Sequence, residues 1–165
     1  DGLLVPGVGA YAACMAGLVS VDGVRIIERR LIASRPVLGI CVGMQMLFAG
    51  SEENPSARGL GVIAGTVRWL PAVLPRPQMQ WNQLTVAPQH ADDPMFDGIG
   101  DLPWMYFVHS FAARPVDPAV VVASTDHGQP ITAMVRHQHL AGCQFHPEKS
   151  QAVGLRILGN FVEGT

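Results

Sequence analysis

Residues 36–48 read PVLGICVGMQMLF, and this stretch decides the fold class. Its first part, Pro36–Ile40, is a short and continuously apolar run, typical of a parallel strand that is covered on both faces. Its second part, from Val42 to Phe48, predicts a helix. Cys41 occupies the junction, so the sequence places a cysteine on a sharp turn at the end of a buried strand.

The same order of elements continues on both sides of this stretch. Strands are predicted over residues 2–6, 83–87, 104–109, 120–124, 131–136 and 140–145, with a glycine-marked strand pair over 59–70. Helices are predicted over 10–19, 22–33 and 150–162, and an irregular, proline-containing loop over 71–82. Because helices and strands alternate early and strands gather late, we expect an α/β domain. Its sheet is expected to be open, twisted and mostly parallel, flanked by helices, with an antiparallel extension.

Composition narrows the class of protein. The 165 residues are 48% apolar and 15% charged, with a net charge of -2, which fits one folded domain and excludes disorder. The 11 Lys and Arg are scattered, so no basic face predicts nucleic acid or membrane as a partner. No apolar run approaches the roughly 20 residues of a membrane span. Cys14, Cys41 and Cys143 form no C-x-x-C pair, which disfavours disulfides and zinc ribbons and favours a reducing cytoplasm.

The segment Gly39-Ile40-Cys41-Val42-Gly43 matches the nucleophile-elbow pattern, with cysteine in place of serine. Such a turn needs small residues two positions either side, because side chains there would collide with neighbouring backbone. The following helix N-terminus favours a thiolate and can hold a developing oxyanion. The alternative is a small buried thiol in a βα turn, which is the interpretation we give to Cys14 and Cys143.

A second segment, Gln144–Ser150 (QFHPEKS), ends an apolar strand and opens the last helix. His146 and Glu148 lie two residues apart, so in an extended chain they face the same side, and Pro147 stiffens the spacing. A thiol needs a base, and the base needs a carboxylate to fix its tautomer. Alone, this segment would be read as a strand-end histidine and a helix-start glutamate. With the cysteine elbow in the same chain, we favour a Cys–His–Glu triad.

Together with further blocks, these motifs resemble the class I glutamine amidotransferases, and among them the glutaminase subunits of imidazole glycerol phosphate synthases. The further blocks are Pro6–Ala10, Gly43–Gln45, Gly50–Glu53, Trp81-Asn82 and Tyr106–Ser110. They run in family order from residue 1 to residue 161. The resemblance therefore covers nearly the whole chain and implies a flavodoxin-like fold.

The resemblance implies that the chain hydrolyses glutamine to glutamate and ammonia. Cys41 would attack the side-chain amide, His146 would be the general base, and Glu148 would orient the imidazole. A γ-glutamyl thioester would then be hydrolysed by water. The oxyanion would be held by backbone N–H groups of Val42 and of the turn Gly7, Val8 and Gly9. Glutamine would be bound by Gln45 and by the strand end at His109, Ser110 and Phe111.

The resemblance also implies a partner, because free ammonia is protonated in bulk water and must travel by a sheltered path. The family's partner is a cyclase subunit with a (β/α)8 barrel fold, which uses the ammonia to make imidazole glycerol phosphate in histidine biosynthesis. Trp81, Asn82 and Lys149 match family residues at that interface. No cofactor or metal is expected: His137 and His139 have a suitable spacing but no acidic or cysteine partner nearby, so we expect a solvated hairpin there.

Three features depart from the family pattern. The family normally has a strand–helix–strand segment before the turn at Pro6–Gly9, so we expect residues 1–165 to be a single, N-terminally truncated amidotransferase domain of low stability on its own. Ala49 stands where the family has glutamate, and Gln78 and Gln80 stand where it has histidine and glycine. The alternatives are a glutaminase subunit of another synthase and a catalytically incompetent interaction module. A cysteine hydrolase of peptides is disfavoured by Gln45.

Overall fold

The computed structural model describes residues 1–164, and its largest element is a six-stranded sheet in the order β1-β2-β12-β11-β10-β7. The strands span Leu3–Gly7 (β1), Val37–Cys41 (β2), Leu140–Cys143 (β12), Pro130–His137 (β11), Val121–Asp126 (β10) and Thr85–Val86 (β7). β1, β2 and β12 are parallel, whereas β11, β10 and β7 continue the sheet in antiparallel fashion. The predicted α/β class, with a parallel region and an antiparallel extension, is confirmed.

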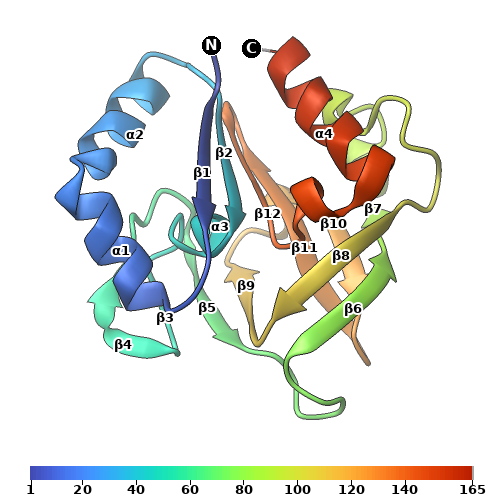
Figure 1. Ribbon diagram of the computed structural model, residues 1–165, viewed down its shortest axis with the longest axis horizontal. Helices are drawn as coiled ribbons and strands as arrows, with labels where there is room; N and C mark the ends of the chain where they lie inside the picture. Colours follow the sequence, from blue (N-terminus) through green and yellow to red (C-terminus); the bar gives the residue numbers. More distant parts are fainter. Residues whose placement is uncertain (165) are drawn as a thin grey trace.

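Helices lie on both sides of the parallel strands. They span Tyr11–Ser20 (α1), Gly23–Ile32 (α2), Val42–Gln45 (α3) and Gln151–Glu163 (α4). Figure 1 shows α1 and α2 on one side of β1 and β2, and α4 on the other. The apolar spacing explains this packing, because Ile27 of α2 and Ile157 and Phe161 of α4 are buried on the faces that the sequence predicts. No helix in the described range is both long and apolar enough to cross a bilayer.

A second sheet and a hairpin flank the main sheet. The second sheet has the order β4-β3-β5-β9, and the hairpin pairs β6 with β8. These strands span Gly50–Ser51 (β3), Asn54–Arg58 (β4), Gly65–Trp69 (β5), Gln78–Gln83 (β6), Trp104–His109 (β8) and Phe111–Pro115 (β9). Short 3-10 turns span Pro88–His90, Pro94–Phe96, Pro118–Val120 and Pro147–Lys149.

The structure corrects three of the predicted elements. The predicted strand pair over 59–70 contains a single strand, β5, because residues 59–64 form bends. The loop predicted over 71–82 ends at residue 77, and β6 follows it: the prolines at 71, 75 and 77 interrupt the chain only up to that point. The helix predicted over 42–48 is a single turn, α3. The strands β3, β4 and β9 had no counterpart in the prediction.

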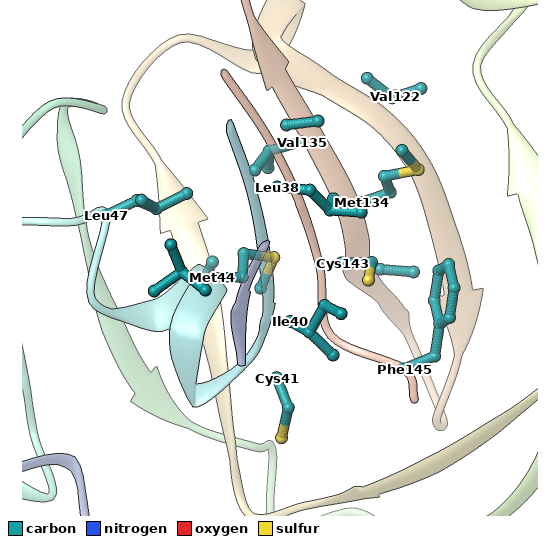
Figure 2. Packing of buried hydrophobic residues seen from close by; sticks show 14 of the residues in the cluster. Leu38, Ile40, Cys41, Met44, Leu47, Val122, Met134, Val135, Cys143 and Phe145 are labelled. Carbon is teal, nitrogen blue, oxygen red and sulfur yellow. The ribbon is translucent and has the colours of Figure 1, made fainter. Parts of the chain in front are cut away.

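The core lies where the parallel strands meet the helices. All five residues of β2 are buried, as predicted for a strand covered on both faces. Figure 2 shows Leu38 and Ile40 of β2 packed beside Met134 and Cys143 of the neighbouring strands, with Cys41 at the margin of this cluster. Each fully buried aliphatic side chain of this kind contributes about 1.5–3 kcal/mol. The end of β2 is therefore a rigid platform for Cys41.

Candidate active site

Cys41 is the last residue of β2 and the residue immediately before α3. Its backbone has φ 55° and ψ -114°, a region that residues with a side chain rarely occupy. The strain is sustained because β2 is hydrogen-bonded between β1 and β12. In Figure 2 the Cys41 sulfur points away from Ile40 and the other labelled core residues. The turn thus directs the thiol out of the core.

The two glycines of the elbow are required by close backbone approaches. A Cβ at Gly39 would lie 2.7 Å from the carbonyl oxygen of Gly43. A Cβ at Gly43 would lie 1.7 Å from the carbonyl oxygen of Val5 in β1. Neither approach is possible for a real side chain, so the predicted collision of side chains at both positions with backbone is confirmed.

His146 follows β12 and precedes the 3-10 turn Pro147–Lys149. Its Nδ1 lies 2.7 Å from Oε1 of Glu148, so Nδ1–H donates to the carboxylate, which in the neutral ring leaves the lone pair on Nε2. The two residues meet across a turn rather than along an extended strand. The imidazole is 4% exposed, whereas the Glu148 side chain is 47% exposed.

The backbone of His146 is fixed to β8. Its N–H donates to the carbonyl of Tyr106 at 2.9 Å. Ser150 closes the segment, because its Oγ donates to the carbonyl of His146 at 2.6 Å and accepts from the N–H of Tyr106 at 3.0 Å. These bonds fix the backbone of His146, and the bond from Nδ1 to Glu148 orients its ring.

Most of the predicted site residues line one cavity of about 360 Å³. It lies beyond the carboxyl ends of the parallel strands, because β1 leads to Val8 and Gly9, β2 ends at Cys41, and β12 leads to His146. Ligands of open α/β sheets bind at this kind of edge. The predicted residues on its wall are Val8, Gly9, Cys41, Val42, Gln45, His109, Ser110, Phe111, His146 and Lys149. Gly7, Trp81, Asn82 and Glu148 are outside the lining, Glu148 being hydrogen-bonded to His146.

Burial dominates the electrostatics of the predicted nucleophile. It raises the pKa of the Cys41 thiol to about 11, with the charge of Glu148 acting in the same direction. Hydrogen bonds from the backbone N–H of Val42 and from Gln144 Nε2, at 3.6 Å, oppose the rise. Cys41 is therefore a protonated thiol at neutral pH and needs a base.

His146 shares the cavity with Cys41, but within residues 1–164 no hydrogen bond joins its ring to the sulfur. In unliganded enzymes such bonds are often long and tighten only when substrate binds. The arrangement brings the thiol and the imidazole to the wall of one cavity.

The predicted glutamine-binding residues are joined by the carbonyl of Phe111. This oxygen accepts from Gln45 Nε2 at 3.2 Å and lies 2.7 Å from His109 Nδ1, which must donate to it. Burial lowers the pKa of His109 to about 4, so the ring is neutral. Its Nε2 then has to accept, and since Gln78 Oε1 lies 2.8 Å away and cannot donate, the buried Gln78 amide must be turned so that its N–H faces the ring. Gln78 thus supports His109, and Gln80 is accommodated as an ordinary residue of β6 paired with Phe107.

Glu53 is a cavity residue to which the sequence analysis assigned no role. Its Oε2 accepts from the backbone N–H of Tyr11 at 2.8 Å, which anchors the carboxylate at the start of α1. The only signal in the sequence was its place in the Gly50–Glu53 block. It supplies a carboxylate on the cavity wall.

The three predicted interface residues differ in how far their side chains are available to a partner. Trp81 on β6 is 40% exposed and stacks edge-on against Tyr106 at 6.0 Å. Lys149 is exposed at the cavity. The Asn82 side chain donates to the carbonyl of Asp126 and accepts from the N–H of Gln83, so it is engaged within the fold.

The remaining cysteines and histidines lie apart from this chemistry. Cys143 is buried as predicted, whereas Cys14 is only partly buried and its Sγ donates to the carbonyl of Val8 at 3.2 Å. His137 at the end of β11 and His139 in the turn before β12 are exposed, as expected for a solvated hairpin. Across residues 1–164, no group of three or more His, Cys, Asp or Glu side chains is gathered closely enough to hold a metal ion.

Comparison with known proteins adds an independent observation. The sequence profile of the class I glutamine amidotransferases matches residues 1–164. The imidazole glycerol phosphate synthase subunit HisH of Rhodospirillum rubrum is 46% identical over 168 residues, which cover 98% of this chain and 77% of that protein. The subunit of the same name from Thermosynechococcus vestitus is 45% identical over 165 residues, covering 98% of this chain and 78% of that one.

Solved structures share the fold. The crystal structure of a glutamine amidotransferase superimposes with a TM-score of 0.71 at 21% identity, covering 98% of this chain and 79% of that one. The structure of PurLQS from Thermotoga maritima also gives a TM-score of 0.71, at 18% identity, covering 99% of this chain and 82% of that one. At this identity the likeness concerns the fold alone.

Proposed function

The chain belongs to the class I glutamine amidotransferases, among the HisH subunits of imidazole glycerol phosphate synthase, and from this premise we propose that it hydrolyses glutamine to glutamate and ammonia for histidine biosynthesis. One observation carries the proposal. A thiol on a strained elbow shares a cavity of about 360 Å³ with an imidazole whose Nδ1 is held by a carboxylate.

In this proposal, Cys41, His146 and Glu148 act in sequence. His146 Nε2 takes the thiol proton as the sulfur attacks the amide carbon, and Glu148 stabilises the imidazolium that forms. The imidazolium then gives the proton to the departing nitrogen, so ammonia leaves and a γ-glutamyl thioester remains. Water, deprotonated by the same imidazole, hydrolyses the thioester to glutamate. A positioned base of this kind contributes about 10²–10⁴-fold in rate.

The oxyanion of each tetrahedral intermediate needs donors close to Cys41. The backbone N–H of Val42, at the start of α3, lowers the pKa of the Cys41 thiol, so we assign it as the first donor. We assign the second donor to the turn Gly7, Val8 and Gly9, whose last two residues line the cavity. Removing one such donor from an enzyme costs about 10²–10³-fold in kcat.

Glutamine carries an α-ammonium and an α-carboxylate, and the cavity has complementary groups. Glu53 supplies a carboxylate that can pair with the ammonium. Gln45, Ser110 and Phe111 line the wall and offer polar contacts for the rest of the molecule. We assign glutamine binding to these four residues, with neutral His109 supporting the carbonyl of Phe111.

Ammonia must reach a synthase without entering bulk water, so the chain works together with a cyclase. We propose that this cyclase is a (β/α)8 barrel and that it docks on the surface containing Trp81 and Lys149, both of which are exposed. Asn82 would shape this surface through its bond to Asp126 rather than contact the cyclase directly. We also propose a cytoplasmic location, because the three cysteines are free thiols, as is usual in a reducing compartment.

The test measures glutamate release from glutamine, with and without the cyclase. We expect release that the cyclase stimulates and that Cys41→Ala and His146→Asn abolish. His139→Asn is the matched control, because this histidine is exposed in a hairpin outside the cavity. Glutamate release that persists in Cys41→Ala, or that is absent from the complex under all conditions, would contradict the proposal.

A further inference from the structure

Two buried amide side chains connect the glutamine-binding wall to the sulfur of Cys41. Gln45 Nε2 donates to the carbonyl of Phe111 at 3.2 Å and to Gln144 Oε1 at 3.0 Å. Gln144 Nε2 then donates to Cys41 Sγ at 3.6 Å. Gln45 is 3% exposed and Gln144 is fully buried. The mechanism above gives Gln144 no task.

The direction of both amides is fixed by a group that cannot reverse. The carbonyl of Phe111 only accepts hydrogen bonds, so Gln45 must turn its nitrogen towards it. That same nitrogen faces Gln144, which therefore has to present its oxygen. The Gln144 nitrogen is left facing the sulfur, because oxygen and nitrogen occupy opposite sides of the amide. The fold thus aims an N–H donor at the thiol.

We propose that Gln144 is a further residue of the catalytic machinery, whose side-chain N–H stabilises the Cys41 thiolate as His146 withdraws the proton. The proposal rests on the proposed function only in taking Cys41 as the nucleophile. A hydrogen bond to an ionised group is about twice as strong as one between neutral groups, so this bond strengthens as charge develops on sulfur. A donor already held in place needs no reorganisation at that moment.

The electrostatics of the thiol agree with this role. The hydrogen bond from Gln144 lowers the pKa of Cys41, against the rise that burial causes. The titratable groups around the sulfur are Cys14 of α1, Cys143 of β12, His146 and Glu148 after β12, and His109, Glu53 and Lys149 on the cavity wall. None of them is altered in Gln144→Met or Gln45→Met, so a change in thiol ionisation in these two variants reports on the amides; Gln144→Glu adds a carboxyl of its own.

The experiment measures alkylation of Cys41 by iodoacetamide between about pH 6 and pH 10, resolved by peptide mass spectrometry. The full chain is used without glutamine, so the result does not depend on turnover. Gln144→Met removes the donor with little change of length. Gln144→Glu keeps an oxygen for Gln45 and places an acceptor near the sulfur. Gln89→Met is the matched control, because Gln89 is exposed in the turn Pro88–His90.

We expect Gln144→Met to raise the pKa of the Cys41 thiol by about one unit, so that alkylation slows throughout the window up to about pH 10, which lies on the rising limb of the profile. At neutral pH the net slowing is about fourfold, because the more basic thiolate is also the better nucleophile. Gln144→Glu moves the profile further, an order that loss of packing alone would not produce. Gln45→Met, which frees the Gln144 amide to turn, gives an intermediate shift. Gln89→Met leaves the profile in place.

Superimposed profiles for Cys41 in the unsubstituted chain and in a folded Gln144→Met or Gln144→Glu would overturn the proposal. If neither Gln144 variant melts cooperatively, Gln45→Met decides by the same criterion. The two proposals fail separately. A shifted profile in a chain that never releases glutamate refutes the glutaminase assignment and leaves the role of Gln144 intact. Unshifted profiles in a chain that does release glutamate refute the role of Gln144 and leave the glutaminase assignment intact.

Discussion

The elbow makes a sharp prediction about Gly43→Ala. The new Cβ would lie 1.7 Å from the carbonyl oxygen of Val5, whereas real contacts begin near 3.0 Å, so β1 and α3 must separate by about 1.3 Å (3.0 - 1.7). Such a displacement disrupts the parallel pairing of β1 with β2. Overpacking of a core typically costs about 1–3 kcal/mol, and a rigid backbone partner places this change at or above the upper end. For a chain of this size, about 3 kcal/mol lowers Tm by about 6–12 °C.

Gly17→Ala is the matched control, because Gly17 lies within α1 and a Cβ there meets nothing within 4 Å. Alanine should stabilise the helix by about 0.5–1 kcal/mol, the opposite sign from Gly43→Ala. The assay is urea unfolding of both variants, followed by circular dichroism. A free energy of unfolding for Gly43→Ala within about 0.5 kcal/mol of the unsubstituted chain would refute the account of the elbow.

Three further predictions concern the cavity. Glu148→Gln should lower kcat for glutamate release about 10²-fold. This is less than the roughly 10⁴-fold loss for a fully buried triad carboxylate, because the Glu148 side chain is 47% exposed. An unchanged kcat would contradict the role of Glu148. Glu53→Gln, which can still accept from Tyr11, should raise KM for glutamine about tenfold or more with little change in kcat, and an unchanged KM contradicts the assignment to the α-ammonium. Folding raises the pKa of Cys41 from 9.0 to about 11. The contribution of this thiol to the free energy of unfolding is therefore fully present below pH 9, and about 3 kcal/mol of it is lost as the pH rises through 11. Urea unfolding at several pH values should show this loss in the unsubstituted chain and a smaller one in Cys41→Ala.

The geometry of the elbow was predictable because it is local. Cys41, its glycines and the flanking strand lie within a few residues, and steric rules alone relate them. The pair His146 and Glu148 is also local in sequence. The spacing did not predict that His146 and Glu148 are joined by a 3-10 turn, because an extended chain would also place their side chains on the same side.

Long-range contacts account for what the sequence left out. Gln144 contacts Cys41 and Gln45, which lie 103 and 99 positions away in the sequence. No periodicity of the sequence predicts contacts at such separations. Glu53 gains its place through Tyr11, 42 positions earlier. The strand β6 escaped prediction because the prolines before it indicate a loop, while its partner β8 lies 20 or more residues further on. In each case tertiary pairing, rather than local preference, decides the outcome.

The most direct measurement is a search for a covalent intermediate on the complex of this chain with its cyclase. The complex is mixed with glutamine, quenched in acid during turnover, digested and examined by mass spectrometry. The account predicts a glutamyl adduct on the peptide that contains Cys41, labile to hydroxylamine as a thioester should be, and absent from Cys41→Ala. Steady glutamate release with the Cys41 peptide unmodified, and undiminished after that thiol has been alkylated, would contradict it.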